Sequence, residues 1–454
     1  MKRKKMAVGV TEGGLAKAII LYAIPLALGI IVQNLFSAVD IAVLGQMADT
    51  TAVAAVGATS AISGLIISIF VGMSTGTKII MSRQIGKGDS AALQNTIYTS
   101  LLTAAAFGIC IAVAGFFLAP LLLKWTNCPT DCLAEAILYV RIYLTGAPFI
   151  LLYNYGSAIL TSAGDSRRPL GYIVAGGLLN IGLNVLLCLL LDQKVIAVAL
   201  ATVASQVLST ILVLYRLCKT NEIYRIRLKE IRWHTYSFIQ ILRRGLPLGL
   251  LNALYPIGNI QLQTAVNAYG VAAVAGAGAA GSLIHISACL DTAFSNTTTV
   301  FMGQSIGAGN PERVKRSFRL SMLFGILGTI VFGTLVIVTS RLSLGFLLGG
   351  DEEAIYYAQI KVFWISGSYF LCIAYNVFAS AIQAYGNTVF SSVASVFGIL
   401  GVRMAWIYLV HPMAPSFSVL MMGYCASWIV STLLNGAGYW YYTRRYRKGI
   451  YIKI

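Results

Sequence analysis

The sequence has few charged residues, and carboxylates are the scarcest. Only 11% of the 454 residues are charged, 58% are hydrophobic, and the mean hydropathy is +0.79. Soluble proteins carry about 25% charged residues. No long polar domain interrupts the apolar runs. This composition excludes an ordinary soluble enzyme or binding domain and predicts an all-α polytopic membrane protein.

Catalytic and cofactor motifs are also missing. We find no phosphate-binding loop, no cluster of metal-ligating side chains and no nucleophile paired with a base. Small residues let membrane helices approach closely. We therefore interpret the Gly-rich stretch from Gly276 to Gly281 as packing rather than nucleotide binding, and we interpret these glycines in the same way: Gly57, Gly64, Gly72, Gly176 and Gly177. We expect no enzyme activity, no cofactor and no bound metal.

The eight cysteines form no redox or metal motif, because they are scattered and mostly lie at apolar positions. Cys128 and Cys132 share one connection between apolar runs, which the charge pattern places outside the cell. These two residues either form a local disulfide or remain unconnected thiols.

Long apolar runs make up nearly the whole chain. The run from Leu15 to about Leu44 follows a basic start, but it is too long for the apolar part of a signal peptide, so we interpret it as a retained first helix. There are twelve runs, six in each half, at about 15–44, 52–80, 92–123, 134–161, 170–191, 195–218, 245–269, 272–302, 317–348, 354–383, 389–410 and 417–442.

A block of sequence occurs twice, and the two copies lie about 222 residues apart. The repeated segments are Ala23–Leu26 with Gly245–Leu248, Ala52–Ala58 with Ala273–Ala279, Ile85–Asp89 with Ile306–Asn310, and Tyr153–Ser166 with Tyr375–Thr388. Because each half has six runs, both halves enter the membrane from the same side and form a parallel repeat. Duplicated halves that pack around a central cavity are typical of secondary transporters. We therefore expect twelve transmembrane helices in two six-helix lobes.

The repeat and the runs together predict the domain organisation. The linker between the halves is either an amphipathic surface helix, anchored by Ile223, Ile226, Ile231 and Trp233, or a simple tether. The predicted parts are a cytoplasmic segment (1–14), an N-lobe (15–218), a cytoplasmic linker (219–244), a C-lobe (245–442) and a cytoplasmic tail (443–454).

The net charge of +18 would suggest nucleic-acid binding in a soluble protein. Here the basic residues cluster in alternate connections, as the positive-inside rule describes. This pattern places both termini in the cytoplasm, and we expect no nucleic acid as a partner. The basic clusters are the N-terminus, Arg83 and Lys87, Arg167 and Arg168, Arg216–Arg244, Arg313–Arg319 and Arg444–Lys453.

Only two of the fifteen carboxylates, Asp40 and Asp291, lie well inside apolar runs. An aspartate at the centre of a membrane helix costs about 2.5–3.5 kcal/mol on insertion scales. Polar groups in this position usually have a function or a dedicated partner.

Asp40 lies on a polar helix face, and the fifth run carries another. Residues three and four apart share a helix face, so these two faces can meet inside the first half. Pro25 removes a backbone donor earlier in the first run and predicts a kink. The predicted polar residues of the N-lobe cavity are Gln33, Asn34, Ser37, Asn180 and Asn184.

We expect Asp40 to couple transport to an ion by protonation or cation exchange, because a low-dielectric site disfavours the charged form of a carboxyl group. A proton that crosses a potential of 100 mV supplies about 2.3 kcal/mol. The alternative is that Asp40, Asn180 and Asn184 form an interhelical hydrogen-bond network without a role in transport.

In the second half Asp291 is either a second cation or substrate site or a hydrogen-bonded structural group. His285 is either a satisfied interior histidine or a proton carrier. Arg403 lies inside the eleventh run and needs a partner or water. The other candidates for a C-lobe cavity wall form polar stripes in the seventh and tenth runs: Asn252, Tyr255, Asn259 and Gln263, then Asn376, Ser380 and Gln383.

Four stretches together resemble the multidrug and toxic compound extrusion (MATE) transporters. They are the first run with Pro25, Asp40 and Gly45, the segment Ala199–Gln206, the segment Gly245–Pro247 with Gln261 and Gln263, and the stretch from Gly303 to Lys315. The resemblance covers almost the whole chain and lies nearer the DinF-like branch. It implies two lobes around a V-shaped cavity, with the family's coupling carboxylate at Asp40 and its kink proline at Pro25. The chain departs from many DinF-like members at Asn184, where they carry an aspartate.

The resemblance implies a secondary active multidrug efflux antiporter that exports organic, often cationic, compounds in exchange for protons or sodium by alternating access. We expect a monomer in the cytoplasmic membrane of a prokaryote, with a small-molecule substrate and the lipid bilayer as its partners. The alternatives are a lipid-linked precursor flippase of the same superfamily and a non-transporting membrane sensor.

Overall fold

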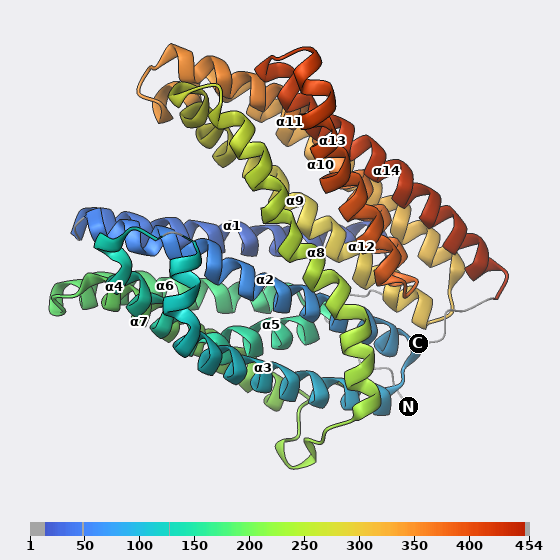
Figure 1. Ribbon diagram of the computed structural model, residues 1–454. Helices are drawn as coiled ribbons and strands as arrows, with labels where there is room; N and C mark the ends of the chain where they lie inside the picture. The colour runs from blue at the N-terminus through green and yellow to red at the C-terminus, as the bar shows by residue number, and fades with distance from the viewer. Residues whose placement is uncertain (1–13, 48–49, 127, 450–454) are drawn as a thin grey trace. The chain divides into compact units, whose positions relative to one another are not determined.

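The computed structural model describes residues 14–47, 50–126 and 128–449, and all secondary-structure elements in these ranges are helices (Figure 1). The longer helices are α1 (Leu15–Met47), α2 (Thr50–Lys87), α3 (Ser90–Trp125), α4 (Thr130–Thr145), α5 (Ala147–Ser162), α6 (Arg167–Leu190), α7 (Lys194–Lys219), α8 (Thr235–Asn267), α9 (Val271–Gly307), α10 (Pro311–Leu347), α11 (Glu352–Ala384), α12 (Thr388–Val396) and α14 (Phe417–Arg447).

These helices follow the twelve predicted apolar runs in order: α4 and α5 together form the fourth run, and α12 is the first part of the eleventh. Ten helical segments of the described residues are long and apolar enough to cross a membrane. The pair α4 and α5 forms an eleventh span, bent by 43° at Gly146. The helix α8 covers the predicted seventh run and carries more polar side chains than most of the others. The predicted all-α membrane architecture is therefore confirmed.

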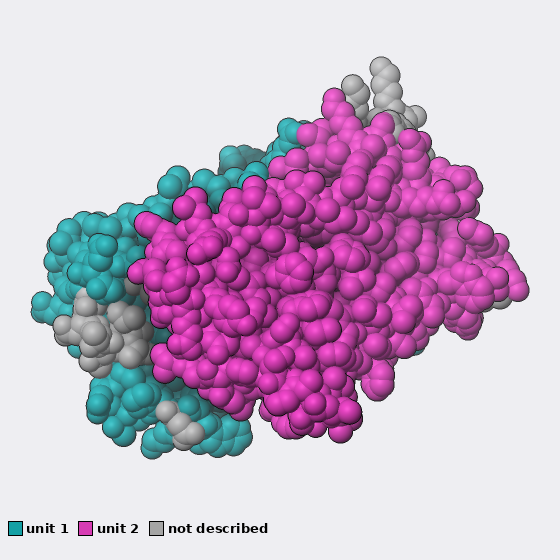
Figure 2. Space-filling model, turned by 90° about the horizontal axis from the view of Figure 1, so that it is seen from above, with its two compact units in different colours: residues 1–8, 28–249 teal, residues 9–27, 250–454 magenta. Residues whose placement is uncertain are grey.

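The chain folds into two compact units, which Figure 2 shows in different colours. Among the described residues, unit 1 comprises Leu28–Gly249, and unit 2 comprises residues 14–27 and 250–449. The helices α1 and α8 each begin in one unit and end in the other. Their division points, before Leu28 and before Leu250, are equivalent positions of the repeat. The predicted cytoplasmic ends lie outside the described residues except for Gly14 and residues 443–449.

The repeated loops form the same turns in both units. Gly88 and Gly309 have φ values of 74° and 66°, in the left-handed region that glycine tolerates. The next residue caps the following helix: Asp89 Oδ1 accepts a bond from Ala92 N (3.1 Å), and Asn310 Oδ1 accepts one from Arg313 N (3.0 Å).

The second repeated loop works in the same way. Gly164 and Gly386 have φ values of 90° and 94°. Asp165 Oδ1 accepts a bond from Arg168 N (3.2 Å), and Asn387 Oδ1 accepts one from Phe390 N (2.9 Å). In both copies of the repeat, the next helix therefore begins with a glycine turn that is followed by a capping side chain.

In unit 1, α3 packs on α4 and α5, α6 packs on α7, and α2 contacts α3, α4 and α5. The first part of α8 crosses α2 very closely. A Cβ atom built on Gly72 would lie 2.5 Å from the Cα atom of Gly249, and Gly76 meets the backbone of Gly245 similarly. Glycine is needed at this crossing because the two backbones touch.

The linker is neither the long amphipathic helix nor the free tether that the sequence suggested. Residues 235–244 of the predicted linker are already the start of α8, and the only helix between α7 and α8 is the short 3₁₀ turn Leu228–Glu230. The linker folds back on unit 1: Ile226 N donates to Leu217 O (3.0 Å), and Gln94 Nε2 of α3 donates to Ile223 O (2.6 Å). Ile226 is buried. These backbone bonds and the buried isoleucine hold the segment against unit 1, while Ile223 and Trp233 are exposed.

In unit 2, α11 is the central helix and packs on α9, α10 and α14. The predicted eleventh run is irregular. The π-helical turns Phe397–Gly401 and Trp406–Val410 flank the short helix Val402–Ala405, and the turn His411–Met413 follows. Such π turns often occur at functional sites, and here they lie on both sides of Arg403.

The described cysteines are free thiols. The Sγ atoms of Cys128 and Cys132 lie 3.8 Å apart, so these two residues are neighbours without being joined.

Candidate functional site

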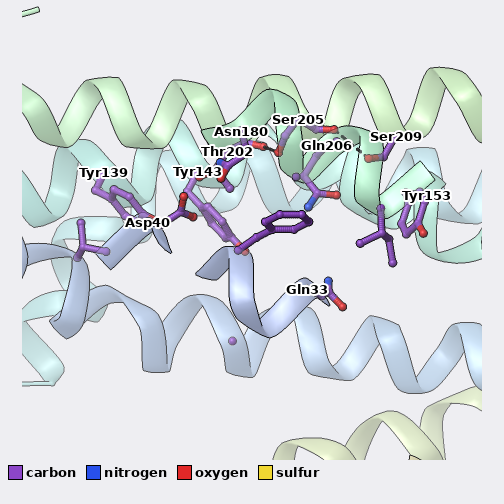
Figure 3. Close-up of a pocket in the computed structure, with 16 residues that line it drawn as sticks. Gln33, Asp40, Tyr139, Tyr143, Tyr153, Asn180, Thr202, Ser205, Gln206 and Ser209 are labelled. Atoms are coloured by element: carbon purple, nitrogen blue, oxygen red, sulfur yellow. Dashed lines mark hydrogen bonds between the residues drawn. The ribbon is translucent and has the colours of Figure 1, made fainter. Parts of the chain in front are cut away.

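Unit 1 contains a cavity of about 300 Å³ between α1, α2, α4, α5, α6 and α7 (Figure 3). Its polar lining is contributed mainly by helices that are far apart in the sequence. The polar side chains are Gln33, Asp40, Tyr139, Tyr143, Tyr153, Asn180, Thr202, Ser205, Gln206 and Ser209. Asp40 is the one charged side chain among the described residues that line this cavity.

Asp40 is bonded by the fifth predicted run, as the two polar helix faces suggested. Asn184 Nδ2 of α6 donates a hydrogen bond to Asp40 Oδ1. The same amide nitrogen lies 3.2 Å from Asn180 Oδ1, one turn earlier on α6. Asn180 and Asn184 are buried, and Asp40 is half-buried. The i, i+4 spacing of the two asparagines therefore holds the carboxylate at the cavity wall.

The same cluster contains an unsatisfied acceptor. Asn184 is fully buried, and its Oδ1 atom has no hydrogen-bond partner in the described structure. A buried polar group without a partner costs about 1–3 kcal/mol. The oxygen atoms of Asp40, Asn180 and Asn184 form a hard donor set without a competing cation from the protein. This arrangement suits a proton or a small hard cation.

Aromatic side chains lie next to the carboxylate. The rings of Tyr139 and Tyr143 stack with a centroid distance of 5.9 Å and an angle of 11°. Figure 3 shows Asp40 beside these two rings. Tyr153 lies farther along the cavity, and its hydroxyl donates to Pro169 O (3.1 Å). A carboxylate with tyrosine faces close by can bind an organic cation by charge and by cation–π contact.

The sequence interpretation missed the contribution of α7. Thr202, Ser205, Gln206 and Ser209 are spaced three and four residues apart and form one polar face toward the cavity. This stripe was present in the sequence, but it carries no charge and lies in an otherwise apolar run.

Gly176 and Gly177 pack closely on neighbouring helices, as expected, and three of the glycines assigned to packing also lie at the cavity. Gly64, Gly176 and Gly177 line the cavity. A Cβ atom on Gly177 would collide with the ring of Phe36, so the missing side chain creates the space that Phe36 occupies in the cavity wall. A glycine at this position therefore does two things: it lets the helices pack closely, and it leaves room for a neighbouring side chain in the cavity wall.

The other N-lobe candidates are more dispersed. Gln33 lines the cavity and lies apart from Asp40 in Figure 3. Asn34 is exposed, and the Ser37 side chain lies outside the described residues. Pro25 lies inside α1, near the point where this helix passes from unit 2 into unit 1.

In unit 2, Asp291 is enclosed by side chains of α9 and α11. Asn376 Nδ2 donates to Asp291 Oδ2 (2.6 Å), and Ser295 Oγ donates to Asp291 Oδ1 (3.4 Å). Cys372 Sγ lies 3.7 Å from Asp291 Oδ2. Asp291 is only 7% exposed. Asn376 and Asp291 were separate candidates in the sequence, and the fold brings them together.

The α8 candidates do not act as one stripe. The hydroxyls of Tyr255 and Tyr375 lie 2.9 Å apart, whereas Gln263 Nε2 donates to Asn267 Oδ1 of its own helix (3.0 Å). Asn252 is half-buried, Gln383 is buried and His285 is exposed, so His285 is not an interior histidine.

Arg403 finds polar partners for its two terminal nitrogens, whereas its buried Nε atom has no hydrogen-bond partner among the described residues. Its Nη1 atom donates to Asn259 Oδ1 (3.3 Å), and its Nη2 atom donates to Ser427 Oγ (3.4 Å). Its guanidinium carbon lies 4.2 Å from the centroid of the Tyr424 ring. Among the C-lobe candidates, Asn259 is therefore engaged with a cation of its own unit.

A family of known proteins matches the chain twice, once in each half of the internal repeat. The MatE family model matches residues 25–186 and residues 247–409. The two matches begin at the equivalent residues Pro25 and Pro247. Each half of the chain is therefore one copy of the same family unit.

Two proteins of Bacillus subtilis are similar along most of their length. The probable multidrug resistance protein YpnP is 29% identical over 67% of this chain and 68% of its own. The probable multidrug resistance protein YoeA is 24% identical over 91% of both chains.

A solved structure has the same fold. It is described as the outward-facing conformation of a multidrug resistance MATE family transporter, and it superposes with a TM-score of 0.91 at 22% identity over 98% of this chain and 100% of that chain. With the two family matches, the bilayer-length helices and the internal repeat, this similarity shows that the chain belongs to the MATE family of membrane transporters.

Proposed function

We propose that this protein is a secondary active antiporter that exports organic, often cationic, compounds in exchange for protons. The observation that carries the proposal is the position of Asp40: a single carboxylate at the wall of a tyrosine-lined cavity, bonded by a buried asparagine. The names of the two Bacillus relatives support multidrug resistance as the biological context.

Export of the substrate is coupled to proton import because the proton and the cationic substrate compete for the Asp40 carboxylate. When Asp40 is ionised, the cavity carries a negative charge that attracts a cationic compound. When Asp40 is protonated, this attraction is lost and the new hydroxyl can donate a hydrogen bond. The unsatisfied Asn184 Oδ1 atom is a buried acceptor in the same cluster. Binding of a proton and binding of a cationic substrate therefore exclude one another, which is the requirement for antiport.

Sodium is the second candidate for the coupling ion. The oxygen atoms of Asp40, Asn180 and Asn184 could contribute to its coordination, and hard cations prefer oxygen ligands. Transport of ethidium in sodium-free buffer under a pH gradient separates the two ions. Ethidium transport that strictly needs sodium would overturn the proton proposal.

The rival functions lack this support. A flippase for lipid-linked anionic precursors needs a basic cavity, whereas the described lining of this cavity contains one carboxylate and no lysine or arginine. A sensor needs a signalling domain, and nearly all of the described chain is membrane-length helix. We propose a monomeric transporter, not an enzyme, in the cytoplasmic membrane with both termini in the cytoplasm, as the basic clusters indicate.

The test uses inside-out membrane vesicles with an acidified lumen. The wild-type protein should accumulate ethidium as protons leave the lumen. Asp40→Asn should reduce this uptake to the level of vesicles without the protein, while the purified variant keeps the wild-type elution volume and helical signal. Uptake by Asp40→Asn at the wild-type rate would reject the coupling role of Asp40.

A further inference from the structure

A second cavity, of about 340 Å³, lies in unit 2 between the start of α10 and the end of α14. Its lining is strongly basic, unlike that of the Asp40 cavity. Four cations line it: Lys315 and Arg319 from α10, and Arg444 and Arg447 from α14. We call this cavity the basic pocket.

The positive charge of the basic pocket is not balanced by nearby carboxylates in the sequence. Glu312 is the one carboxylate of α10, and no aspartate or glutamate follows Glu353 in the chain. Four ion pairs of the described residues involve cations outside the pocket: Lys87, Arg168, Arg227 and Arg341. No described carboxylate forms an ion pair with these four cations, and four cations that share one pocket favour an anionic ligand.

Aromatic side chains also line the basic pocket. The rings of Phe318 and Tyr439 stack with a centroid distance of 4.0 Å, and this pair joins α10 to α14. The Arg444 guanidinium carbon lies 3.5 Å from the centroid of Trp440, whose side chain is exposed. Tryptophan and tyrosine followed by basic residues are typical of the membrane–water interface. The basic pocket therefore lies at the level of the lipid headgroups.

An exposed apolar stripe leaves the basic pocket along α10. Leu323, Leu327 and Ile330 are exposed and follow Arg319 at spacings of four, eight and eleven residues. These spacings keep all four side chains on one helix face. The chemistry of this face thus changes from cationic to apolar within one helix turn.

A matching stripe runs along α14. Trp440, Leu433 and Ile429 are exposed and precede Arg444 on one helix face. Both walls of the basic pocket therefore continue into apolar surface. A soluble anion would contact only the cations of the pocket. An amphiphile would contact the cations with its headgroup and the apolar stripes of α10 and α14 with its acyl chains.

We propose that the basic pocket binds the phosphate headgroup of an anionic phospholipid, with its acyl chains along the stripes of α10 and α14. Guanidinium groups bind phosphate oxygens in pairs, and lysine adds a point charge. Basic pockets between membrane helices bind the headgroups of acidic lipids. This lipid site is separate from the Asp40 cavity, and the proposal does not depend on the transport mechanism.

Lipid binding can be measured through the fluorescence of Trp440, because this residue lines the basic pocket. The full-length protein is reconstituted into phosphatidylcholine vesicles that contain a small fraction of phosphatidylglycerol with brominated acyl chains, which quench nearby tryptophan. The Trp440 signal is the difference between the wild type and Trp440→Phe. We expect brominated phosphatidylglycerol to quench Trp440 with at least about fivefold preference over brominated phosphatidylcholine at equal fraction.

Two double variants that lose the same charge test the site. Lys315→Gln with Arg319→Gln removes two pocket cations and leaves the contact between Arg444 and Trp440 intact, so the preference should fall below about twofold. Arg316→Gln with Arg445→Gln removes two cations that do not line the pocket, and the preference should persist. An equal loss in both double variants would show general surface attraction and overturn the proposal.

Inorganic phosphate distinguishes the two sources of a phosphate group. At constant ionic strength, millimolar phosphate should leave the lipid preference unchanged if the stripes contribute to binding. Complete displacement of the lipid by phosphate would overturn the lipid assignment and indicate a site for a soluble anion.

Discussion

The two aspartates that lie well inside apolar helices, Asp40 and Asp291, have different surroundings. Asp40 in unit 1 is half-buried, lies at a cavity wall and accepts a hydrogen bond from Asn184. Asp291 in unit 2 is 7% exposed and contacts Asn376, Ser295 and Cys372. Asp40 keeps space beside it for an ion or a substrate, whereas Asp291 is occupied by the protein itself. We therefore expect Asp40, and not Asp291, to be the transport site.

The repeat does not copy either aspartate. Aligned on Pro25 and Pro247, Asp40 corresponds to Leu262. Aligned on the repeated alanines of α2 and α9, Asp291 corresponds to Phe70. Duplication preserved the glycine turns and helix caps, which any copy needs to fold, while the chemistry of each half changed separately.

The largest effect should come from removing the two charges in turn. Asp40→Asn should abolish proton-driven ethidium uptake, whereas Asp291→Asn should retain it, because only Asp40 borders the cavity. If Asp291→Asn also reduced uptake to background while the protein stayed folded, the distinction between a coupling and a structural aspartate would fail.

Asp291 should instead contribute to stability. Asp291→Ala leaves the Asn376 amide without its acceptor, which should lower the free energy of unfolding by about 1–3 kcal/mol. Thermal unfolding in detergent measures the change. An unchanged midpoint would mean that water replaces the aspartate and that Asn376 does not depend on it.

The close crossing of α2 and α8 in unit 1 can be tested by adding a methyl group at Gly72. Gly72→Ala should destabilise the protein by about 1–3 kcal/mol or more, because its Cβ atom would meet the Gly249 backbone and the helices would have to separate. Gly57→Ala on the same helix is the control, since no neighbouring atom lies within 4 Å of its Cβ position. Equal midpoints for the two variants would contradict the close crossing.

The corresponding crossing in unit 2 has larger residues. Ala23 and Ala27 stand where α8 has Gly245 and Gly249, and Tyr22 and Phe301 make an aromatic contact there with a centroid distance of 5.4 Å. The two crossings therefore have different residue sizes although they descend from one repeat.

The two prolines give a further comparison. Pro25 and Pro247 each lie just before the point where α1 or α8 changes unit. Pro25→Ala restores a backbone donor in the helix that carries Asp40, so it should slow ethidium uptake several-fold more than Pro247→Ala. Initial uptake rates at equal protein levels provide the test. Equal slowing would mean that both prolines serve the same motion, independent of the carboxylate.

The smallest effect should come from the tyrosines beside Asp40. Tyr143→Leu should raise the KM for ethidium about two- to tenfold by removing an aromatic face, whereas Tyr143→Phe should retain the wild-type KM. A neutral dye should not distinguish the two variants. If Tyr143→Phe were as impaired as Tyr143→Leu, the hydroxyl rather than the ring would be the important group.

Much of the architecture could be predicted from the sequence because the bilayer strongly limits which local structures and which side chains a membrane segment can have. Runs of apolar residues must be helices that satisfy their own backbone, and the cost of a buried charge makes Asp40 and Asp291 conspicuous. The repeated glycine turns and caps of Ile85–Asp89 and Ile306–Asn310 are local as well. Spans, repeat and candidate carboxylates therefore follow from residues that are close together in the chain.

The assignment of those carboxylates needed the tertiary structure. In lipid, the outer face of a helix is as apolar as its packed face, so the sequence does not show how each helix is rotated. Only the packed helices reveal that the α7 stripe from Thr202 to Ser209 borders the Asp40 cavity and that Asn376 encloses Asp291. The division of α1 and α8 between the units has the same origin, because it depends on contacts between distant segments rather than on either helix alone.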